Sequence, residues 1–201
     1  MSTKERLFEI ALNLFSERGF KATSIRAITR EAGLSIAAFY NHFSSKDELL
    51  KQMYAHYVSQ YITGKVVQLS EERLDALGPV HLFQMIGESL AQSMKNEKLV
   101  RLSRIIMMEQ YTNQTARAIT INDKKVLLDA TEQLFILMKN KNMIAVDDPE
   151  IIGKIIGYAY LGFASDNANY SLIEGEDPEA RILAQTEVIL AYIRSILTRP
   201  C

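Results

Sequence analysis

The stretch that decides the fold is residues 25–43, which read IRAITREAGLSIAAFYNHF. Apolar residues recur in it at helical spacing on both sides of Gly33, and nothing in it alternates at the period of a strand. Gly ends helices readily and Ser is a preferred N-cap, so one helix is expected to end near Gly33 and another to begin after Ser35. The pattern predicts two short helices joined by a tight turn, which is the layout of a helix-turn-helix unit.

A further helix is expected in front of this stretch, over residues 3–18. Ser2 and Glu5 form a Ser-x-x-Glu capping box at its start, and Gly19 ends it. Thr23 is the expected N-cap of the helix that follows. The N-terminal part is therefore predicted to be a unit of three helices.

The remainder of the chain keeps the helical spacing with few breaks. A second capping box at Ser45 opens a long helix expected over 46–67, and Gly78-Pro79 interrupts the pattern. Asp148 and Asp177 are the expected N-caps of the last two helices. The later helices are expected over 79–94, 97–111, 115–141, 149–170 and 178–198. The chain is predicted to be all-α, with about nine helices.

Composition and charge exclude several classes of protein. The chain has 201 residues, room for one large or two small domains, and 48% apolar with 23% charged residues argue against disorder. The formal net charge is −1, and the small basic surplus within residues 1–51 is too weak to argue nucleic-acid binding by itself. The single cysteine, Cys201, fits a reducing compartment. Without a signal peptide or a run near eighteen apolar residues, the expectation is a cytoplasmic protein with no membrane partner.

The residue types of enzymatic and metal chemistry lack the necessary spacing. His42, His56 and His81 stand far apart, and no cysteine pair accompanies them. The chain shows no Gly-rich phosphate loop and no nucleophile motif, and helix capping accounts for the paired carboxylates. We therefore expect no enzyme, no metal and no cofactor.

A set of N-terminal residues falls at a characteristic spacing. Its members are Ile10, Ala11, Leu12, Leu14, Phe15, Gly19, Phe20, Thr23, Ser24, Ile25, Ile28, Glu31, Ala32, Gly33, Leu34, Ser35, Phe39, Tyr40, His42, Phe43, Lys46, Leu49 and Leu50. With these residues the chain resembles the TetR family of bacterial transcription regulators. The resemblance covers roughly residues 3–55, and the rest of the chain agrees with the family in length, helicity and the position of breaks.

This resemblance implies a domain organisation and a function. It implies an all-α homodimer with a helix-turn-helix DNA-binding domain over 1–47 and an effector-binding and dimerisation domain over 48–201. Most such proteins are repressors that leave a palindromic operator on double-stranded DNA when a small-molecule effector binds. The sequence does not separate repression from activation.

Candidate base contacts lie at the front of the second short helix. Residues at the N-terminal end of a recognition helix face base edges in the major groove, which selects Ser35, Ile36, Ala37 and Asn41. Asn can bond adenine, and Ile or Ala can contact a thymine methyl. Ser35 is also a candidate helix cap, and the two roles are compatible.

Candidate phosphate contacts flank these residues. Thr23, Ser24 and Arg26 lie at a helix start, where free N–H groups and the dipole favour phosphate. The family's motif adds Tyr40, His42 and Lys46. Phe39 and Phe43 are expected in the core.

Residues 36–38 depart from the family. A polar or basic residue, a Gly, and a Thr or Ser are frequent there, whereas this chain has Ile36, Ala37 and Ala38. Phosphate contacts are then expected to carry more of the affinity. The departure also motivates an alternative, a helical small-molecule-binding protein whose N-terminal unit no longer reads sequence.

The predicted effector pocket is apolar, which favours a hydrophobic or aromatic ligand. Ordinary core packing is the alternative for each of its residues. The candidates are Phe83, Met107, Met108, Tyr111, Phe135, Met138, Tyr160, Phe163 and Asn167. Polar side chains that could orient a ligand are not ranked by the sequence; they are Gln84, Glu88, Arg104, Glu109, Gln110, Asp166 and Asn167.

The last two helices are predicted to form the dimer interface. One face of the first carries small or apolar residues at helical spacing, and the second has its own apolar stripe. Two helices from each subunit would form a four-helix interface. The alternative is that these faces pack within one subunit. The predicted interface residues are Gly153, Gly157, Leu161, Ala164, Ile189 and Ile193.

Overall fold

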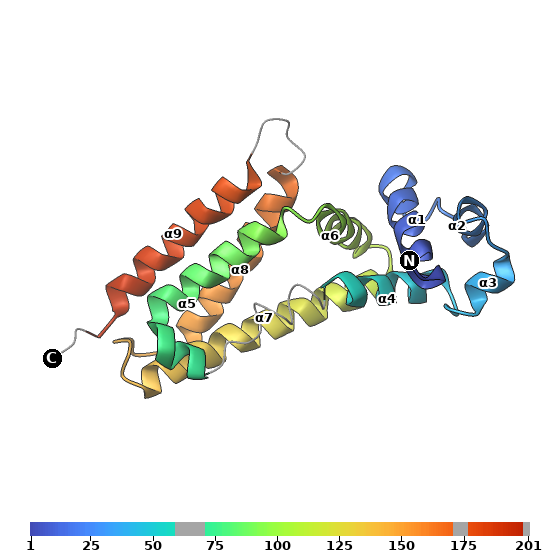
Figure 1. Ribbon diagram of the computed structural model, residues 1–201. Helices are drawn as coiled ribbons and strands as arrows, with labels where there is room; N and C mark the ends of the chain where they lie inside the picture. Colours follow the sequence, from blue (N-terminus) through green and yellow to red (C-terminus); the bar gives the residue numbers. More distant parts are fainter. Residues whose placement is uncertain (59–70, 171–176, 199–201) are drawn as a thin grey trace. The chain divides into compact units, whose positions relative to one another are not determined.

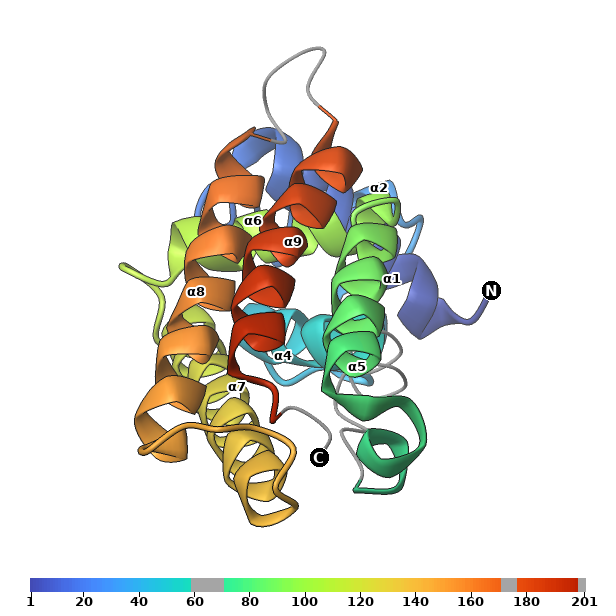
Figure 2. The same cartoon turned by 90° about the vertical axis from the view of Figure 1, so that its left-hand side faces the viewer.

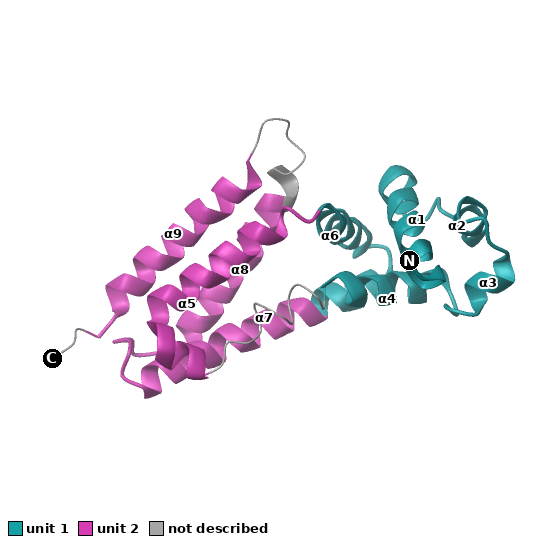
Figure 3. Cartoon of the chain, viewed as in Figure 1, with its two compact units in different colours: residues 1–60, 97–121 teal, residues 61–96, 122–201 magenta. Residues whose placement is uncertain are grey.

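The computed structural model describes residues 1–58, 71–170 and 177–198 (Figure 1, and turned by 90° in Figure 2). These ranges form the helices α1 to α9, and their only β-type pairing is an isolated bridge between Ile144 and Leu197. The all-α prediction is therefore confirmed. The chain divides into two compact units: unit 1 comprises residues 1–60 and 97–121, and unit 2 comprises residues 61–96 and 122–201 (Figure 3).

Unit 1 begins with four helices, which are α1 (Thr3–Arg18), α2 (Ile25–Glu31), α3 (Ile36–Tyr40) and α4 (Lys46–Val58). The predicted capping box of α1 is present, since the Ser2 hydroxyl accepts from the Glu5 N–H at 3.2 Å and the Glu5 carboxylate accepts from the Ser2 N–H at 2.7 Å. Helix α4 follows its predicted course to Val58. The rest of the helix expected over 46–67 lies outside the described residues, as does Cys201.

Helix α6 (Glu97–Glu109) and the first residues of α7 (Gln114–Asn140) complete unit 1. Leu102, Ile105 and Ile106 of α6 join the same core as α1 and α4. The Asn113 side chain donates to the carboxylate of Asp47 at 2.6 Å. Packing thus groups α4 and α6 with the first three helices, whereas the boundary predicted after residue 47 separates them; as a functional boundary it stays a prediction.

Unit 2 contains α5 (Glu71–Ser93), the larger part of α7, α8 (Pro149–Tyr170) and α9 (Pro178–Ile196). Helix α5 begins before the predicted residue 79, and the predicted break is a kink at Gly78, with φ 72°. In Figure 2, α9 lies between α8 and α5 and packs on both.

The predicted caps of the last two helices are present in unit 2. Asp148 accepts from the Ile151 N–H at 3.2 Å, and Asp177 accepts from the N–H groups of Glu179 and Ala180. Among the helices of the described ranges, none is long and apolar enough to cross a membrane.

Candidate functional site

Gly33 makes the turn between α2 and α3. Its φ is +62°, in the left-handed region that favours glycine. The Leu34 N–H donates to the Thr29 carbonyl at 2.8 Å, and the Gly33 N–H donates to the Arg30 carbonyl at 3.1 Å. The turn is therefore closed by backbone hydrogen bonds, as the helix-turn-helix pattern predicts.

Helix α3 is held by one face and exposed on the other. The rings of Phe39 and Phe43 are buried and lie 5.4 Å apart between centroids, so both are core residues as predicted. The Ser35 hydroxyl accepts from the Ala38 N–H at 3.1 Å, which confirms the cap and leaves the hydroxyl proton available to donate. Tyr40 packs edge-on against Phe39 yet is 54% exposed.

Most of the predicted DNA contacts are accessible. The side chains that solvent reaches are Ser24, Arg26, Ser35, Ile36, Ala37, Tyr40, Asn41 and His42. Their contact with DNA stays a prediction. Ile36 is 39% exposed, which is unusual for an isoleucine and places an apolar group on the outer face of α3.

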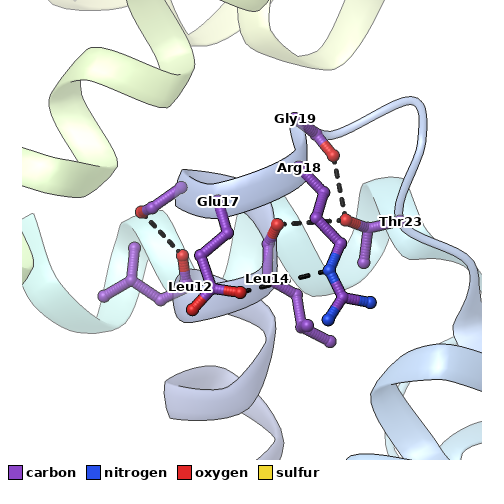
Figure 4. Close-up of polar contacts among 7 residues, drawn as sticks. Leu12, Leu14, Glu17, Arg18, Gly19 and Thr23 are labelled. Atoms are coloured by element: carbon purple, nitrogen blue, oxygen red, sulfur yellow. Dashed lines mark hydrogen bonds and ion pairs between the residues drawn. The ribbon is translucent and has the colours of Figure 1, made fainter.

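The structure corrects the prediction that Thr23 caps α2. Thr23 is 1% exposed, and its hydroxyl donates to the carbonyls of Leu14 at 3.2 Å and Gly19 at 2.9 Å (Figure 4). Ser24 is the N-cap of α2, since its hydroxyl accepts from the Ala27 N–H at 3.1 Å. The predicted cap was wrong by one residue because Thr and Ser suit the position equally. The buried Thr23 side chain has no access to a phosphate.

The ammonium group of Lys46 makes hydrogen bonds within the fold. Its Nζ donates to the carbonyls of Phe20 at 2.5 Å and Thr23 at 2.7 Å, and it lies 4.3 Å from the centroid of the Phe20 ring. Burial lowers the pKa of the Lys46 ammonium. An ammonium has three donors, so at most one remains for the predicted phosphate contact.

The predicted effector residues fall into both units. Met107, Met108 and Tyr111 belong to unit 1, and Met108 and Tyr111 are more than three-quarters exposed. The others belong to unit 2, where Phe163 packs against a single apolar core. The members of that core among the candidates are Phe83, Phe135, Met138 and Tyr160. Within unit 2 the structure thus brings Phe83, Phe135, Met138, Tyr160 and Phe163 together in one core.

Among the seven polar candidates that the sequence left unranked, Asn167 alone is buried, at 4% exposure. Its amide donates to the Oε1 atom of Gln185 on α9 at 2.8 Å. The sequence analysis missed Gln185. It lies eighteen residues from Asn167 on another helix, and the spacing of residues within one helix does not reveal such a contact.

The predicted dimer interface needs correction. A Cβ on Gly153 would lie 2.6 Å from the Cα of Glu132, and one on Gly157 would lie 2.6 Å from the hydroxyl oxygen of Thr131. These glycines therefore let α8 approach α7 closely within unit 2. Ile189 and Ile193 are buried in the core of the same unit. Four predicted interface residues consequently pack inside the subunit, while Leu161 is half-buried and Ala164 is exposed.

A different face of the last two helices is exposed and apolar. On α8, Ile151 and Ile155 are each 55% exposed and Tyr158 is 53% exposed; on α9, Leu183 and Val188 are exposed. The α8 residues recur at intervals of four and three, so they share one helix face. The sequence contained this signal beside the glycine face, but periodicity alone does not show which face meets which partner.

Comparisons with known proteins match the N-terminal unit in sequence. Residues 7–53 match the family model for bacterial regulatory proteins of the tetR family. The HTH-type transcriptional regulator YerO of Bacillus subtilis is 44% identical over 55 residues, which are 27% of this chain and 19% of YerO. The HTH-type transcriptional repressor KstR2 of Mycolicibacterium smegmatis is 29% identical over 68 residues, which are 34% of this chain and 33% of KstR2. The chain thus spans about a fifth to a third of these curated relatives.

A solved structure matches nearly the whole length of the chain. NalD, the secondary repressor of the MexAB-OprM multidrug efflux pump in Pseudomonas aeruginosa, aligns over 99% of this chain and 97% of NalD, with a TM-score of 0.69 and 22% identity. At this identity the likeness shows a common fold.

The fold and its closed helix-turn-helix turn define the class, a helix-turn-helix protein with a second helical unit. Residues 7–53 match the tetR family model, so the resemblance that the sequence predicts for the N-terminal part is confirmed. YerO is named as a transcriptional regulator, KstR2 as a transcriptional repressor and NalD as a secondary repressor.

Proposed function

We propose that the protein is a TetR-type repressor that binds a palindromic operator as a homodimer and leaves it when a small-molecule effector binds unit 2. The observation that carries the proposal is the outer face of α3. Buried Phe39 and Phe43 hold the helix from behind, while Ser35, Ile36 and Ala37 are exposed at its front. This is the arrangement that a recognition helix needs to enter a major groove.

The exposed groups divide into two kinds of contact. Ile36 and Ala37 offer methyl groups, which suit thymine methyls, and Asn41 offers an amide, which suits adenine. Ser24, Arg26, Tyr40 and His42 are placed for phosphates, which position the protein without reading sequence. Base readout in this protein would therefore be dominated by apolar contacts.

A homodimer would place two recognition helices in successive major grooves, roughly 34–36 Å apart. The exposed apolar face of Ile151, Ile155 and Tyr158 on α8, with Leu183 and Val188 on α9, supports such an assembly. An isologous interface needs one self-complementary patch, and the apolar face of Ile151, Ile155 and Tyr158 on α8 would supply it.

Effector binding and DNA binding would be coupled through helix α7. Helix α7 contributes residues to both units, and Asn113, just before its start, binds Asp47 in the first turn of α4. An effector that favours a different arrangement of α7 would act on unit 1 through this link. The coupling must be reciprocal, so operator DNA weakens effector binding by the same factor.

The alternative function is a helical sensor that binds DNA without reading its sequence. The apolar residues at 36–38 favour it, because they remove polar base contacts. Specificity separates the two: a regulator prefers its operator over random DNA by at least about 10³-fold. Sequence-blind binding would instead follow salt alone.

The test is a titration of the full-length protein against the DNA that flanks its own gene, with excess random DNA as competitor. We expect saturable binding that survives the competitor. Ala37→Glu, which places a negative charge on the outer face of α3, should abolish it. Ala118→Glu, the same change at an exposed site on α7, is the matched control and should bind normally. Binding that the competitor removes would instead support the sequence-blind alternative.

A further inference from the structure

Two buried polar atoms of α8 have no hydrogen-bond partner in the part of the chain that the structure describes. They are the hydroxyl oxygen of Tyr160, a residue 7% exposed, and the amide oxygen Oδ1 of Asn167, a residue 4% exposed. Buried polar atoms without a partner are costly and rare in native proteins, so each requires an explanation.

The two buried threonines of unit 2 are satisfied within the fold. Thr131 donates to the Leu127 carbonyl at 2.9 Å, and Thr186 donates to the Ile182 carbonyl at 2.8 Å. Asn167 itself is half satisfied, because its Nδ2 donates to Gln185 at 2.8 Å. That bond fixes the amide and leaves Oδ1 as an oriented acceptor.

The two unsatisfied atoms belong to one face of α8, which also carries Phe163. Tyr160, Phe163 and Asn167 follow one another at intervals of three and four, so they lie on one face of α8. The rings of Tyr160 and Phe163 meet edge-on at 6.4 Å, and Tyr160 belongs to the apolar core that contains Phe83 and Phe135. Seven residues of helix separate the two polar groups by on the order of 10 Å along the axis.

The surroundings of Tyr160 disfavour a charged ligand group. Among the described residues of unit 2 that are buried as a whole, none carries a carboxylate, ammonium or guanidinium group, while on α9 the Nε atom of the partly exposed Arg181 is buried one turn before Gln185. Burial also raises the pKa of the Tyr160 phenol, which keeps it neutral and able to donate. A charged group beside Tyr160 would have no partner to offset its cost of desolvation.

We infer that Tyr160 and Asn167 are the two polar anchors of an effector site in unit 2. The ligand is aromatic or alicyclic, on the order of 10 Å long, and uncharged at the end that meets Tyr160. It carries an acceptor for the Tyr160 hydroxyl and a donor for Asn167 Oδ1. This inference rests on the effector-binding part of the proposed function and names its ligand class.

Two fluorescent probes test the anchors separately. Prodan is a neutral naphthalene with a carbonyl acceptor and no N–H or O–H donor, so it should depend on Tyr160. N-phenyl-1-naphthylamine is neutral with one N–H donor, so it should depend on Asn167.

The variants are Tyr160→Phe and Asn167→Leu, with Thr186→Val as the matched control for loss of a buried hydroxyl that is already satisfied. Tyr160→Phe should weaken Prodan binding roughly three- to tenfold and leave N-phenyl-1-naphthylamine unchanged. Asn167→Leu should do the reverse, and Thr186→Val should bind both probes like the wild type.

Thermal melting without probe gives an independent readout. Tyr160→Phe should melt at the wild-type temperature or above it, since the variant removes an unsatisfied polar atom. A lower melting temperature would show that the hydroxyl is satisfied within the fold, and would overturn the inference. Failure of the wild type to bind either neutral probe, or equal affinities in wild type and both variants, would overturn it too.

These measurements contain no DNA, so they separate this inference from the repressor proposal. Operator-specific binding without probe binding would reject the anchors alone. Probe binding with the expected variant pattern, but no operator preference, would leave the anchors and reject the repressor.

Discussion

The ammonium of Lys46 donates to the backbone carbonyl of Thr23 at 2.7 Å, which joins two residues that the sequence assigns to DNA phosphates. Thr23 in turn donates to the carbonyls of Leu14 and Gly19. The first residue of α4 is thereby tied to the segment that connects α1 with α2. The family motif at these two positions consequently has a structural role in fixing the helix-turn-helix unit.

Lys46→Met should lower the stability of the protein, because methionine keeps an apolar stem and loses both hydrogen bonds to carbonyls. Hydrogen bonds to charged groups contribute about 1.5–3 kcal/mol each, and partial exposure of Lys46 reduces this, so we expect a loss of about 1–3 kcal/mol. Urea unfolding followed by circular dichroism measures it. Lys51→Met, at an exposed position of the same helix, is the control and should unfold like the wild type. Equal unfolding midpoints for both variants would contradict the structural role.

Unlike Lys46→Met, the variant Arg26→Ala should change DNA binding and leave stability unchanged. Arg26 is exposed in the first turn of α2, beside the cap Ser24, so its loss should leave the unfolding free energy unchanged. If the guanidinium neutralises one phosphate, the slope of log affinity against log salt should decrease by about one. A titration over several salt concentrations measures the slope. An unchanged slope would remove Arg26 from the DNA contacts.

Thymine methyl groups in the operator should matter more than is usual for a helix-turn-helix protein. Ile36 and Ala37 offer only apolar surface at the front of α3. Their favourable contact with a base is therefore mainly the apolar contact with a thymine methyl group. Replacing thymine by uracil within a half-site should cost about 0.8 kcal/mol per contacted methyl, a factor of about four in affinity. The variant Ile36→Ser should bind thymine and uracil operators with a smaller difference. Equal affinity of the wild type for both operators would exclude methyl readout.

For this protein, the sequence predicts local features of single helices well and contacts between distant segments poorly. The capping box of α1, the turn at Gly33 and the cap at Asp177 are local signals, and the structure confirms them. The burial of Gly157 against α7 and the bond from Lys46 to Thr23 join distant segments, so spacing within one helix contains no information about them. The exposed methyl groups of α3 could be predicted, because a recognition helix has its outer face defined by the motif.

The glycines of α8 offer a direct test of the corrected packing. Gly153→Ala would bring a Cβ within 2.6 Å of the Cα of Glu132 and 2.8 Å of the Thr131 carbonyl, and backbone atoms do not move aside. We expect a loss of stability of roughly 1–3 kcal/mol, with the subunit itself affected. Gly162→Ala is the matched control on the same helix, since a Cβ there meets nothing within 4 Å and alanine favours helix. If Gly153→Ala changes only the oligomeric state in size-exclusion chromatography, the glycine face of α8 would belong to the dimer interface after all.

Tyr160 should make the protein sensitive to alkaline pH. An unfolded tyrosine loses its proton near pH 10, whereas burial raises the pKa of Tyr160 in the folded protein, which keeps the proton. Above about pH 10 unfolding therefore releases a proton, and the stability that is fully present below that pH falls as the pH rises, by up to about 1.4 kcal/mol per pH unit. Urea unfolding at intervals between about pH 9 and pH 11 should show a steeper decline in the wild type than in Tyr160→Phe. Burial also raises the pKa of Tyr57, but this residue is common to both proteins and cancels in the comparison. Parallel declines in the two proteins would show that Tyr160 ionises as freely in the folded state as in the unfolded chain, and would argue against its place in a dry, aromatic site.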